Sequence, residues 1–226
     1  IGGGEPFVKP KALKECLKGF RGSGVGIEYI ETNASWAADA ASRPEDLLEE
    51  LLGLGADTLL ISISPFHNEY IPYAKTERLI RACRSAGMGI FPWVEGFIGD
   101  LTAFDTSLPH SMEEFEDRFG AGYLRSLPGR YWINMRGRAL DTYERFMTPR
   151  PLDELLRENA RGCTELTDTS HFHVDLYGHY IPGLCPGLGI PAEGLSSSLT
   201  ADEFPLLTLL MTGGPAGLLE YAREKF

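Results

Sequence analysis

Residues 56–64 read ADTLLISIS, and this stretch decides the fold class of the chain. A short and nearly continuous apolar run is typical of a strand that is buried on both faces within a parallel sheet. The two-residue repeat of a strand gives one wholly apolar face and one face that becomes polar toward the carboxyl end. The apolar face carries Leu59, Ile61 and Ile63, and the other face carries Leu60, Ser62 and Ser64. We expect the apolar face to contact a layer of helices.

Strand and helix signals alternate on both sides of this stretch. Apolar spacing, capping boxes of the form S-x-x-E and terminal glycines mark the helices, and β-branched and aromatic runs mark the strands. The expected elements are a strand at 25–34, a helix through 47–52 behind the capping box Ser42–Glu45, a helix at 73–86, a strand at 89–97, a helix behind the capping box Ser111–Glu114, a strand at 131–140 and a helix at 151–159.

Alternating strands and helices with short connections predict a parallel sheet built from βα units. Both a barrel and an open, doubly wound sheet fit this order. Polar residues at the carboxyl end of residues 56–64 favour the barrel, because barrel enzymes keep their sites at that end; a strand end that simply meets solvent is the alternative. We therefore predict an α/β fold, namely a partial TIM-like (βα)6 barrel that lacks its first strand.

The chain opens with IGGGEPFVKP at residues 1–10. We interpret this opening as the end of a strand, a tight glycine turn and the start of a helix. The helix would turn an apolar stripe inward, made of Leu13, Cys16, Leu17 and Phe20. A glycine-rich turn between strand and helix can offer its backbone groups to a ligand, although a turn that only packs tightly gives the same pattern.

The pattern changes after Gly162. Alternation across residues 171–176, a turn at Tyr177-Gly178 and a second short strand up to Cys185 predict a β-hairpin outside the βα series. Cys163 and Cys185 flank this hairpin.

Composition limits the class of protein. The chain has 226 residues and a formal net charge of −11, which argues against nucleic acid and against an anionic membrane surface as partners. Four scattered cysteines and the absence of a secretory signal or an apolar span predict a cytoplasmic protein without a disulfide scaffold. The first residue is Ile rather than Met, so we expect a piece of a longer protein.

In their order along the chain, the glycine turn and the strand ends resemble the radical S-adenosylmethionine (radical SAM) superfamily. The motifs that carry the resemblance are Gly3-Gly4-Glu5-Pro6, Thr32-Asn33 and Ser62-Ile63-Ser64. The resemblance implies a partial (βα)6 barrel in which the G-G-E-P turn bonds the amino group of S-adenosylmethionine. It also implies that polar residues at later strand ends hold the carboxylate and the ribose of that cofactor.

The resemblance also implies a domain division. Residues 1–161 would form the radical SAM partial barrel with strands 2–6, and residues 162–226 would form a truncated extension similar to a SPASM or twitch domain. Such extensions carry auxiliary iron–sulfur clusters, to which Cys163 and Cys185 would contribute. An auxiliary cluster needs about four ligands, so two cysteines are insufficient. The whole enzyme would take an electron from an electron donor, cleave S-adenosylmethionine at a 4Fe-4S cluster and act through a 5′-deoxyadenosyl radical on a small-molecule or peptide substrate.

One departure from the family concerns mechanism. The family's C-x-x-x-C-x-x-C triplet supplies three thiolates to the catalytic 4Fe-4S cluster, and no two cysteines of this chain lie closer than 22 residues apart. We therefore expect the fragment alone to be inactive.

The candidate cofactor-binding residues are Gly3, Gly4, Glu5, Pro6, Thr32, Asn33, Ser62, Ser64 and Glu95. Each has a simpler structural interpretation: Glu5 could bond local N–H groups, and the polar strand ends could cap their strands. Glu95 at the end of a strand must pair or reach solvent, because an unpaired buried carboxylate is costly. We expect Cys16 and Cys83 to be core residues on helix faces.

Two other functions stay open. One is a TIM-barrel hydrolase or isomerase that binds a divalent metal through Glu95, His171, His173 and Asp175. The other is a binding scaffold that keeps the barrel and performs no catalysis.

Overall fold

The computed structural model describes residues 1–226 except 38–42, 136, 166–167, 169–171, 184–187 and 197–198. The chain divides into two compact units, Ile1–Ile133 (unit 1) and Asn134–Phe226 (unit 2). Each unit is described by itself. The boundary between residues 161 and 162 that the sequence predicts stays a prediction.

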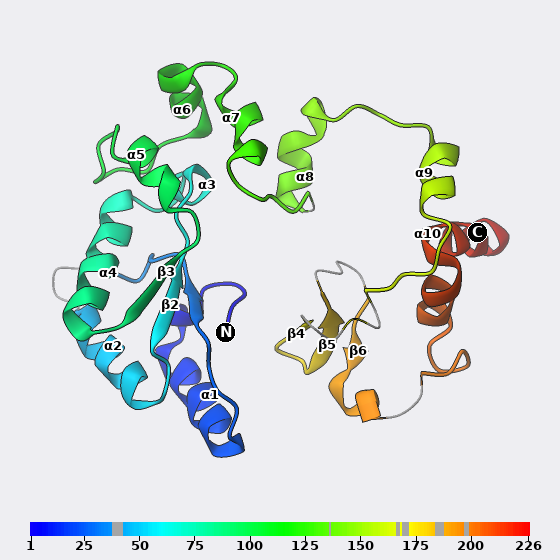
Figure 1. The fold of residues 1–226 in the computed structure, drawn as a ribbon, viewed down its shortest axis with the longest axis horizontal. Helices are drawn as coiled ribbons and strands as arrows, with labels where there is room; N and C mark the ends of the chain where they lie inside the picture. Colours follow the sequence, from blue (N-terminus) through cyan, green and yellow to red (C-terminus); the bar gives the residue numbers. More distant parts are fainter. Residues whose placement is uncertain (38–42, 136, 166–167, 169–171, 184–187, 197–198) are drawn as a thin grey trace. The chain divides into compact units, whose positions relative to one another are not determined.

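Unit 1 is built on a three-stranded parallel sheet in the order β1-β2-β3 (Figure 1). The strands are β1 (Ile30–Thr32), β2 (Thr58–Ile61) and β3 (Gly89–Pro92), and they pair in the register Ile30–Leu59–Ile90. Each lies within a strand that the sequence predicts. Neighbouring strands follow one another along the chain, which is the order expected of consecutive βα units.

The first residue continues this sheet on the free side of β1. The Ile1 nitrogen donates to the Tyr29 carbonyl at 2.7 Å, and the Glu31 N–H donates to the Ile1 carbonyl at 2.7 Å. These two bonds are those of one parallel bridge, with Ile1 opposite Ile30. The prediction that a strand ends at the glycine turn is therefore confirmed as far as the single ladder residue Ile1.

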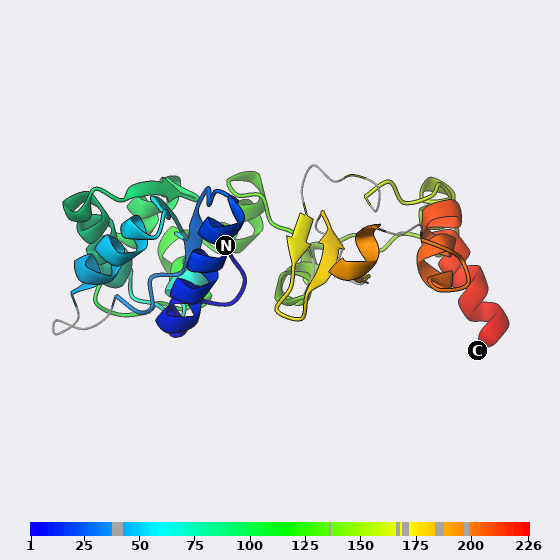
Figure 2. The same ribbon diagram turned by 90° about the horizontal axis from the view of Figure 1, so that it is seen from below.

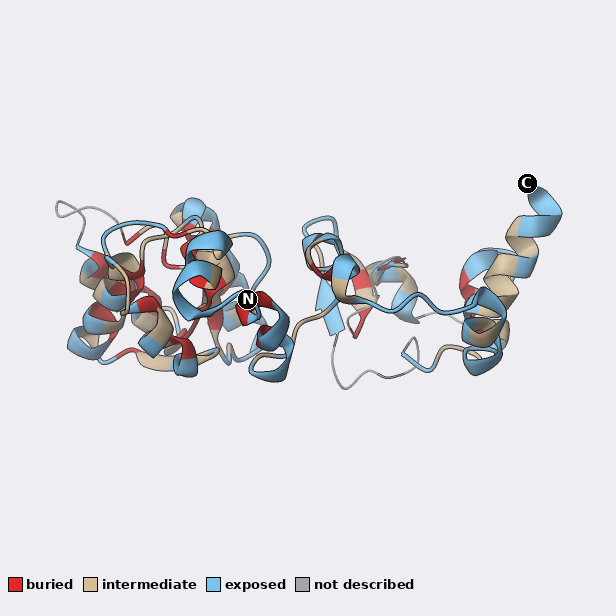
Figure 3. Cartoon of the chain, turned by 90° about the horizontal axis from the view of Figure 1, so that it is seen from above, coloured by how far each residue is buried: buried red, intermediate tan, exposed pale blue. Residues whose placement is uncertain are grey.

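Three helices accompany the sheet, and α2 and α4 pack against each other. They are α1 (Pro10–Ser23), α2 (Pro44–Gly53) and α4 (Tyr73–Ala86). Leu17, Leu48, Leu51 and Leu79 on these helices are fully buried, as are Leu59, Ile61 and Ile63 of the apolar strand face; Figure 3 draws buried residues in red. This confirms the predicted division of residues 56–64 on its apolar side, whereas Leu60 is buried as well.

The two helix cysteines differ in burial. Cys83 is buried in α4, and burial raises the pKa of its thiol to about 12, as expected of an inert core residue. Cys16 is exposed, so its predicted core position is wrong. The buried stripe of α1 is only Leu13 and Leu17, because this helix lies at the rim of unit 1 and buries a narrow face.

Helix ends follow the predicted chemistry in most places. In α6 (Met112–Phe119) the Ser111 hydroxyl accepts from the Glu114 N–H and the Glu114 carboxylate accepts from the Ser111 N–H, which confirms this capping box. Helix α4 ends at Gly87, which has a left-handed φ of 74°. Ser42 of the other capping box lies outside the described residues, and α2 has Arg43 as its N-cap without a side-chain bond.

The sequence predicts a strand at residues 131–140, but residues 131–135 and 137–140 form none. Residues 131–135 are irregular, Gly137 has a φ of 52°, and α8 (Arg138–Tyr143) begins directly after it. The Tyr131 ring packs edge-on against Trp93 and Phe97, so the aromatic character of this stretch serves side-chain packing rather than a ladder. A short apolar run cannot by itself distinguish these outcomes.

Short helical segments also occur along the chain from Pro6 to Phe146. They are η1 (Pro6–Val8), α3 (Pro65–Asn68), η2 (Glu95–Phe97), α5 (Ile98–Leu101), α7 (Tyr123–Ser126), η3 (Leu127–Gly129) and η4 (Glu144–Phe146). Asp100 of α5 accepts from the Tyr123 hydroxyl in α7 and from Arg130, the C-cap of η3, both at 2.6 Å. The described strands form no closed barrel.

Unit 2 contains the predicted hairpin. Strands β4 (Phe172–Val174) and β5 (His179–Pro182) are antiparallel, and β6 (Ile190–Pro191) pairs with β5 as a third strand; Figure 2 shows the three side by side. The predicted turn holds Asp175, whose Oδ1 accepts from the N–H groups of Tyr177 and His179 at 2.8 and 2.9 Å. Gly178 completes the turn with a φ of 79°.

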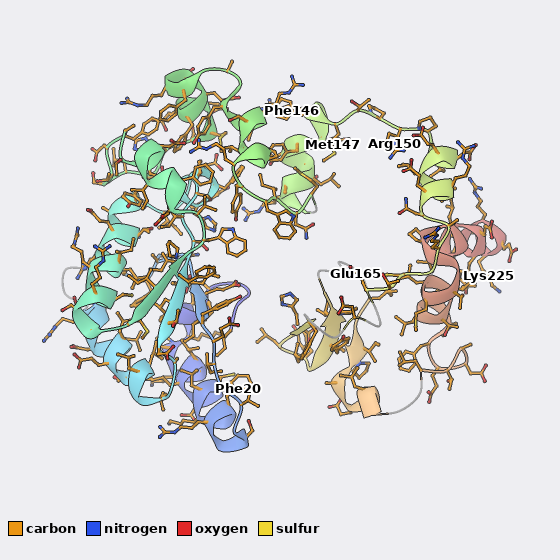
Figure 4. The ribbon with its side chains drawn as sticks, in the orientation of Figure 1. Phe20, Phe146, Met147, Arg150, Glu165 and Lys225 are labelled. Carbon is orange, nitrogen blue, oxygen red and sulfur yellow. The ribbon has the colours of Figure 1, made fainter. Side chains whose placement is uncertain are left out.

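Three helical segments complete unit 2. They are α9 (Leu152–Glu158), η5 (Ala192–Ser196) and α10 (Pro205–Lys225). Helix α9 matches the predicted helix, and Arg150 (labelled in Figure 4) pairs with Glu154 and Glu158 on its surface. Helix α10 packs a small apolar core of Ile190, Leu207 and Leu210, with Cys163 at its border. None of the described helices combines the length and the apolar character that crossing a membrane requires.

Candidate functional site

The candidate site lies at the carboxyl edge of the unit 1 sheet. The ladder continues one residue beyond β2 and β3, because the Ser62 N–H donates to the Thr32 carbonyl at 2.9 Å and the Trp93 N–H donates to the Ile61 carbonyl at 3.1 Å. Parallel strands end at a common edge, where ligands bind in open and closed α/β sheets. The predicted site residues Thr32 and Ser62 are thus neighbours.

Glu5 fastens the glycine turn to this edge. Its carboxylate accepts hydrogen bonds from the Asn33 N–H at 2.7 Å, from the Thr32 hydroxyl at 3.1 Å and from the Phe7 N–H at 3.1 Å. Burial raises the pKa of Glu5 above its ordinary value, and the bonds from Asn33, Phe7 and Thr32 oppose that rise. The simpler of the two predicted roles, bonding local N–H groups, therefore applies to Glu5.

Gly3 and Gly4 shape the turn itself. Both have left-handed backbones, with φ of 83° and 61°, and both are exposed. A β-carbon added at either position would meet no atom within 4 Å. Pro6 then begins η1, with Glu5 as its cap. A side chain would have space at both positions, so the need for glycine comes from the left-handed backbone, which only glycine adopts without strain.

Thr32 is the buried centre of the edge, with an exposed fraction of 2%. Its hydroxyl donates to Glu5 and accepts from the Trp36 indole N–H at 3.0 Å and from the Ala34 N–H at 3.1 Å. The Trp36 ring stacks on Phe7, with 4.4 Å between ring centroids and 4° between the planes. The hydrogen bonds of Thr32 and the stacked rings of Phe7 and Trp36 therefore connect the glycine turn to the loop after β1.

The loop after β1 holds backbone strain. Ala34 has a φ of 63°, the one described non-glycine residue with a positive φ, and it is fully buried. A left-handed non-glycine residue costs about 1–3 kcal/mol and persists only where its surroundings impose it. Two bonds do so: the Ala34 N–H to Thr32, and the Ser35 N–H to the Asn33 side chain at 2.9 Å. Strain of this kind gathers at functional sites.

Ser62 and Ser64 have different positions. Ser62 is half-buried on the edge next to Thr32. Ser64 is buried and caps α3: its hydroxyl accepts from the His67 N–H at 3.3 Å and lies 2.7 Å from His67 Nδ1. Ser64 therefore caps a helix rather than the strand that the sequence predicts, and its hydroxyl is engaged with His67.

Glu95 is separate from this network. It is exposed at the start of η2, and its side chain makes no hydrogen bond or ion pair with a described residue. It satisfies the requirement that the carboxylate reach solvent. Among the described residues, no hydrogen bond or ion pair connects it to Glu5, Thr32 or Ser62.

The predicted metal ligands are not brought together in the described part of the chain. Cys163 is half-buried beside the unit 2 core, and its N–H donates to the Leu210 carbonyl at 2.9 Å, while Cys185 and His171 lie outside the described residues. Asp175 also contacts His179 Nδ1 at 3.0 Å, which binds it to the hairpin turn. Among the described residues no three His, Cys, Asp or Glu side chains form a group that could hold a metal.

Sequence reasoning missed three contributors to this site: Phe7, Trp36 and Ala34. The spacing of Trp36 four residues after Thr32 was a usable signal, since a side chain can reach back over a tight loop of that length. The left-handed backbone of Ala34 leaves no mark in the sequence, because alanine rarely adopts it. No protein-family model, curated protein or solved structure matches this chain in the comparisons.

Proposed function

We propose that unit 1 is the S-adenosylmethionine-binding part of an enzyme of the radical SAM type. The observation that carries this proposal is the Glu5 network, which fixes the G-G-E-P turn against Thr32 and Asn33 at the carboxyl edge of a sequentially ordered parallel sheet. The motifs that support the resemblance are thereby neighbours in space as well as in order.

The residues at this edge fit the amino acid part of S-adenosylmethionine. The peptide carbonyl groups of Gly3 and Gly4 make no hydrogen bond with a described residue, and both residues are exposed. Carbonyl oxygens accept from an ammonium group, and the Asn33 side chain and the Ser62 hydroxyl lie at the same edge for polar groups of the ligand. Glu5 acts as a positioning residue, because its own acceptor sites are occupied by Asn33, Thr32 and Phe7.

The residues of this chain do not fit the catalytic 4Fe-4S cluster. Its cysteines are at least 22 positions apart, so they provide no triplet. When bound to a reduced cluster, S-adenosylmethionine supplies the radical chemistry of this superfamily; the part assigned to this chain is to bind and orient the cofactor. The cytoplasmic location, the electron donor and an auxiliary cluster belong to the same proposal.

Gly4→Val is expected to weaken S-adenosylmethionine binding by about tenfold or more, because a branched side chain strains the left-handed backbone and fills the open space before the turn. Isothermal titration calorimetry of the chain with S-adenosylmethionine measures this effect. The matched control is Gly24→Val: Gly24 has a φ of 75°, its added β-carbon also meets nothing within 4 Å, and it ends α1. Equal affinity in the two variants would make the turn purely structural.

A further inference from the structure

The unit 1 sheet carries a row of residues that the cofactor site does not use, on the side to which Ser62 points by alternation. By strand alternation Ile30 and Thr32, both buried, point to one side of β1, while Tyr29 and Glu31 point to the other. The sheet register places Glu31, Leu60 and Phe91 in one row across the three strands. We call the side of the sheet that carries this row the Glu31 face.

Aromatic rings flank this row. The Tyr29 and Phe91 ring centroids are 6.2 Å apart, and those of Trp93 and Tyr131 are 6.3 Å apart. Phe91 is 49% exposed and Trp93 is 40% exposed, whereas Leu60 between them and Glu31 is 3% exposed. Exposed aromatic rings that gather beside a buried aliphatic residue are typical of a binding surface. Scattered surface apolar residues do not form such a group.

The charge of this face comes from Glu31. Its carboxylate is half-buried and makes no hydrogen bond or ion pair with a described side chain. Burial raises the pKa of Tyr29 and of Tyr131, and the negative charge of Glu31 adds to both rises, while a hydrogen bond with Trp93 opposes the rise at Tyr131. The Glu31 carboxylate gives this face a negative charge, so the face is complementary to positive charge.

The chain keeps space for this carboxylate. A β-carbon at Gly2 would lie 2.5 Å from Glu31 Oε2, so only glycine at position 2 leaves the acid in place. The α-amino group of Ile1 also senses this field: burial lowers its pKa and the Glu31 charge raises it. Its hydrogen bond nevertheless goes to the Tyr29 carbonyl and leaves the Glu31 oxygens open.

We propose that the Glu31 face binds a ligand with an alkylammonium group, so that the substrate of this enzyme is an amine. The ammonium would pair with the Glu31 carboxylate, and the alkyl chain would lie against the exposed rings of Phe91 and Trp93. Ammonium groups are attracted both to a carboxylate and to the faces of aromatic rings, and the attraction grows where water is partly excluded. This inference deepens the proposed function. Binding of an alkylammonium group does not depend on that function, whereas calling the ligand a substrate does.

The probe for this face is n-butylammonium, with n-butanol as its neutral match. The chain has three tryptophans, so the indole N–H signals in ¹H–¹⁵N NMR spectra resolve Trp93 from Trp36 and Trp132, with Trp93→Phe giving the assignment. We expect the Trp93 signal to shift in a saturable way with a dissociation constant on the order of 10 mM for the ammonium. Butanol is expected to bind at least about threefold more weakly.

Glu31→Gln is expected to raise the dissociation constant of n-butylammonium by about fivefold or more, because the amide keeps the shape and loses the charge. The matched control is Glu28→Gln, a nearby exposed acid that also acts on Tyr29 and is expected to change the value by less than about twofold. If Glu31→Gln does not fold, Phe91→Leu at a half-exposed position gives the second test, with an expected weakening of about twofold to threefold.

S-adenosylmethionine also carries an ammonium group, so the titration is repeated with saturating S-adenosylmethionine. An unchanged n-butylammonium affinity assigns the face to a separate ligand, as proposed, and direct competition would overturn that assignment. Equal binding of butanol, or an unaffected Glu31→Gln variant, would overturn the charge recognition. If S-adenosylmethionine does not bind but the n-butylammonium results hold, the cofactor proposal fails while the amine site stands.

Discussion

Gly214→Ala is expected to lower the free energy of unfolding of unit 2 by about 2–4 kcal/mol. Gly214 interrupts α10 with φ 62° and ψ −163°, a conformation that is essentially restricted to glycine. An added β-carbon would lie 2.2 Å from the Arg161 carbonyl oxygen and 2.8 Å from the Asn159 carbonyl oxygen. Both obstacles are backbone, so the chain after α9 would have to separate from α10.

Gly213 provides the matched control one residue earlier. A β-carbon at Gly213 meets no atom within 4 Å, and its φ is not left-handed. Gly213→Ala is therefore expected to be neutral or to stabilise α10 by about 0.5–1 kcal/mol. Hydrogen exchange measured by mass spectrometry on peptides from residues 152–163 and 205–225 reports both variants. Equal exchange in Gly214→Ala and Gly213→Ala would mean that the kink of α10 does not dock on residues 159–161.

Thr32→Val is expected to lower the free energy of unfolding of unit 1 by about 2–4 kcal/mol. The two side chains have nearly the same volume, so the loss comes from the hydroxyl alone. Its removal takes one donor from Glu5 and leaves the N–H groups of Trp36 and Ala34 without their acceptor. The strained backbone of Ala34 would lose one of the bonds that hold it.

Thr58→Val tests the same change at the opposite end of the sheet. The Thr58 hydroxyl donates to Asp57 at 2.9 Å on the surface, so the expected cost is below about 0.5 kcal/mol. All three tryptophans lie in unit 1, so urea unfolding followed by tryptophan fluorescence compares the two variants. A Thr32→Val midpoint that matches Thr58→Val would contradict the described role of the Thr32 hydroxyl.

Elements with strong local signals could be predicted from the sequence. Helix α4 begins and ends where its apolar spacing and Gly87 indicate, and the capping box at Ser111 forms as expected. The burial of Leu59, Leu60 and Ile61 in β2 follows from its continuous apolar run. In these places propensity, pattern and terminal residues all agree, which is the condition under which local sequence determines structure.

Two predictions failed because tertiary contacts decided them. Residues 131–140 have the aromatic character of a strand. The ring of Tyr131 instead packs against Trp93 and Phe97, and helix α8 begins directly after Gly137. Cys16 lies on the apolar stripe of α1 but remains exposed, because the extent of the buried face depends on what the helix packs against.

The candidate site could be predicted in outline only. Strand ends and a glycine turn indicated Thr32, Asn33 and Ser62, and the structure places them at one edge with the turn. The sequence could not show that the Glu5 carboxylate accepts hydrogen bonds that fix the turn, because a carboxylate that binds a ligand has the same local sequence pattern. Glu31 was missed because only the sheet register reveals the row that it shares with Phe91.

The most direct test of the proposed function is to record ¹H–¹⁵N NMR spectra of the chain during titration with S-adenosylmethionine. We expect saturable shifts of the backbone amides of Gly3, Gly4, Asn33 and Ser62, which lie at the carboxyl edge of the sheet. Methionine alone is expected to shift Gly3 and Gly4 and to leave Ser62 in place. Unshifted amides at this edge, or saturable shifts confined to other parts of unit 1, would contradict the assignment of cofactor binding to the G-G-E-P turn.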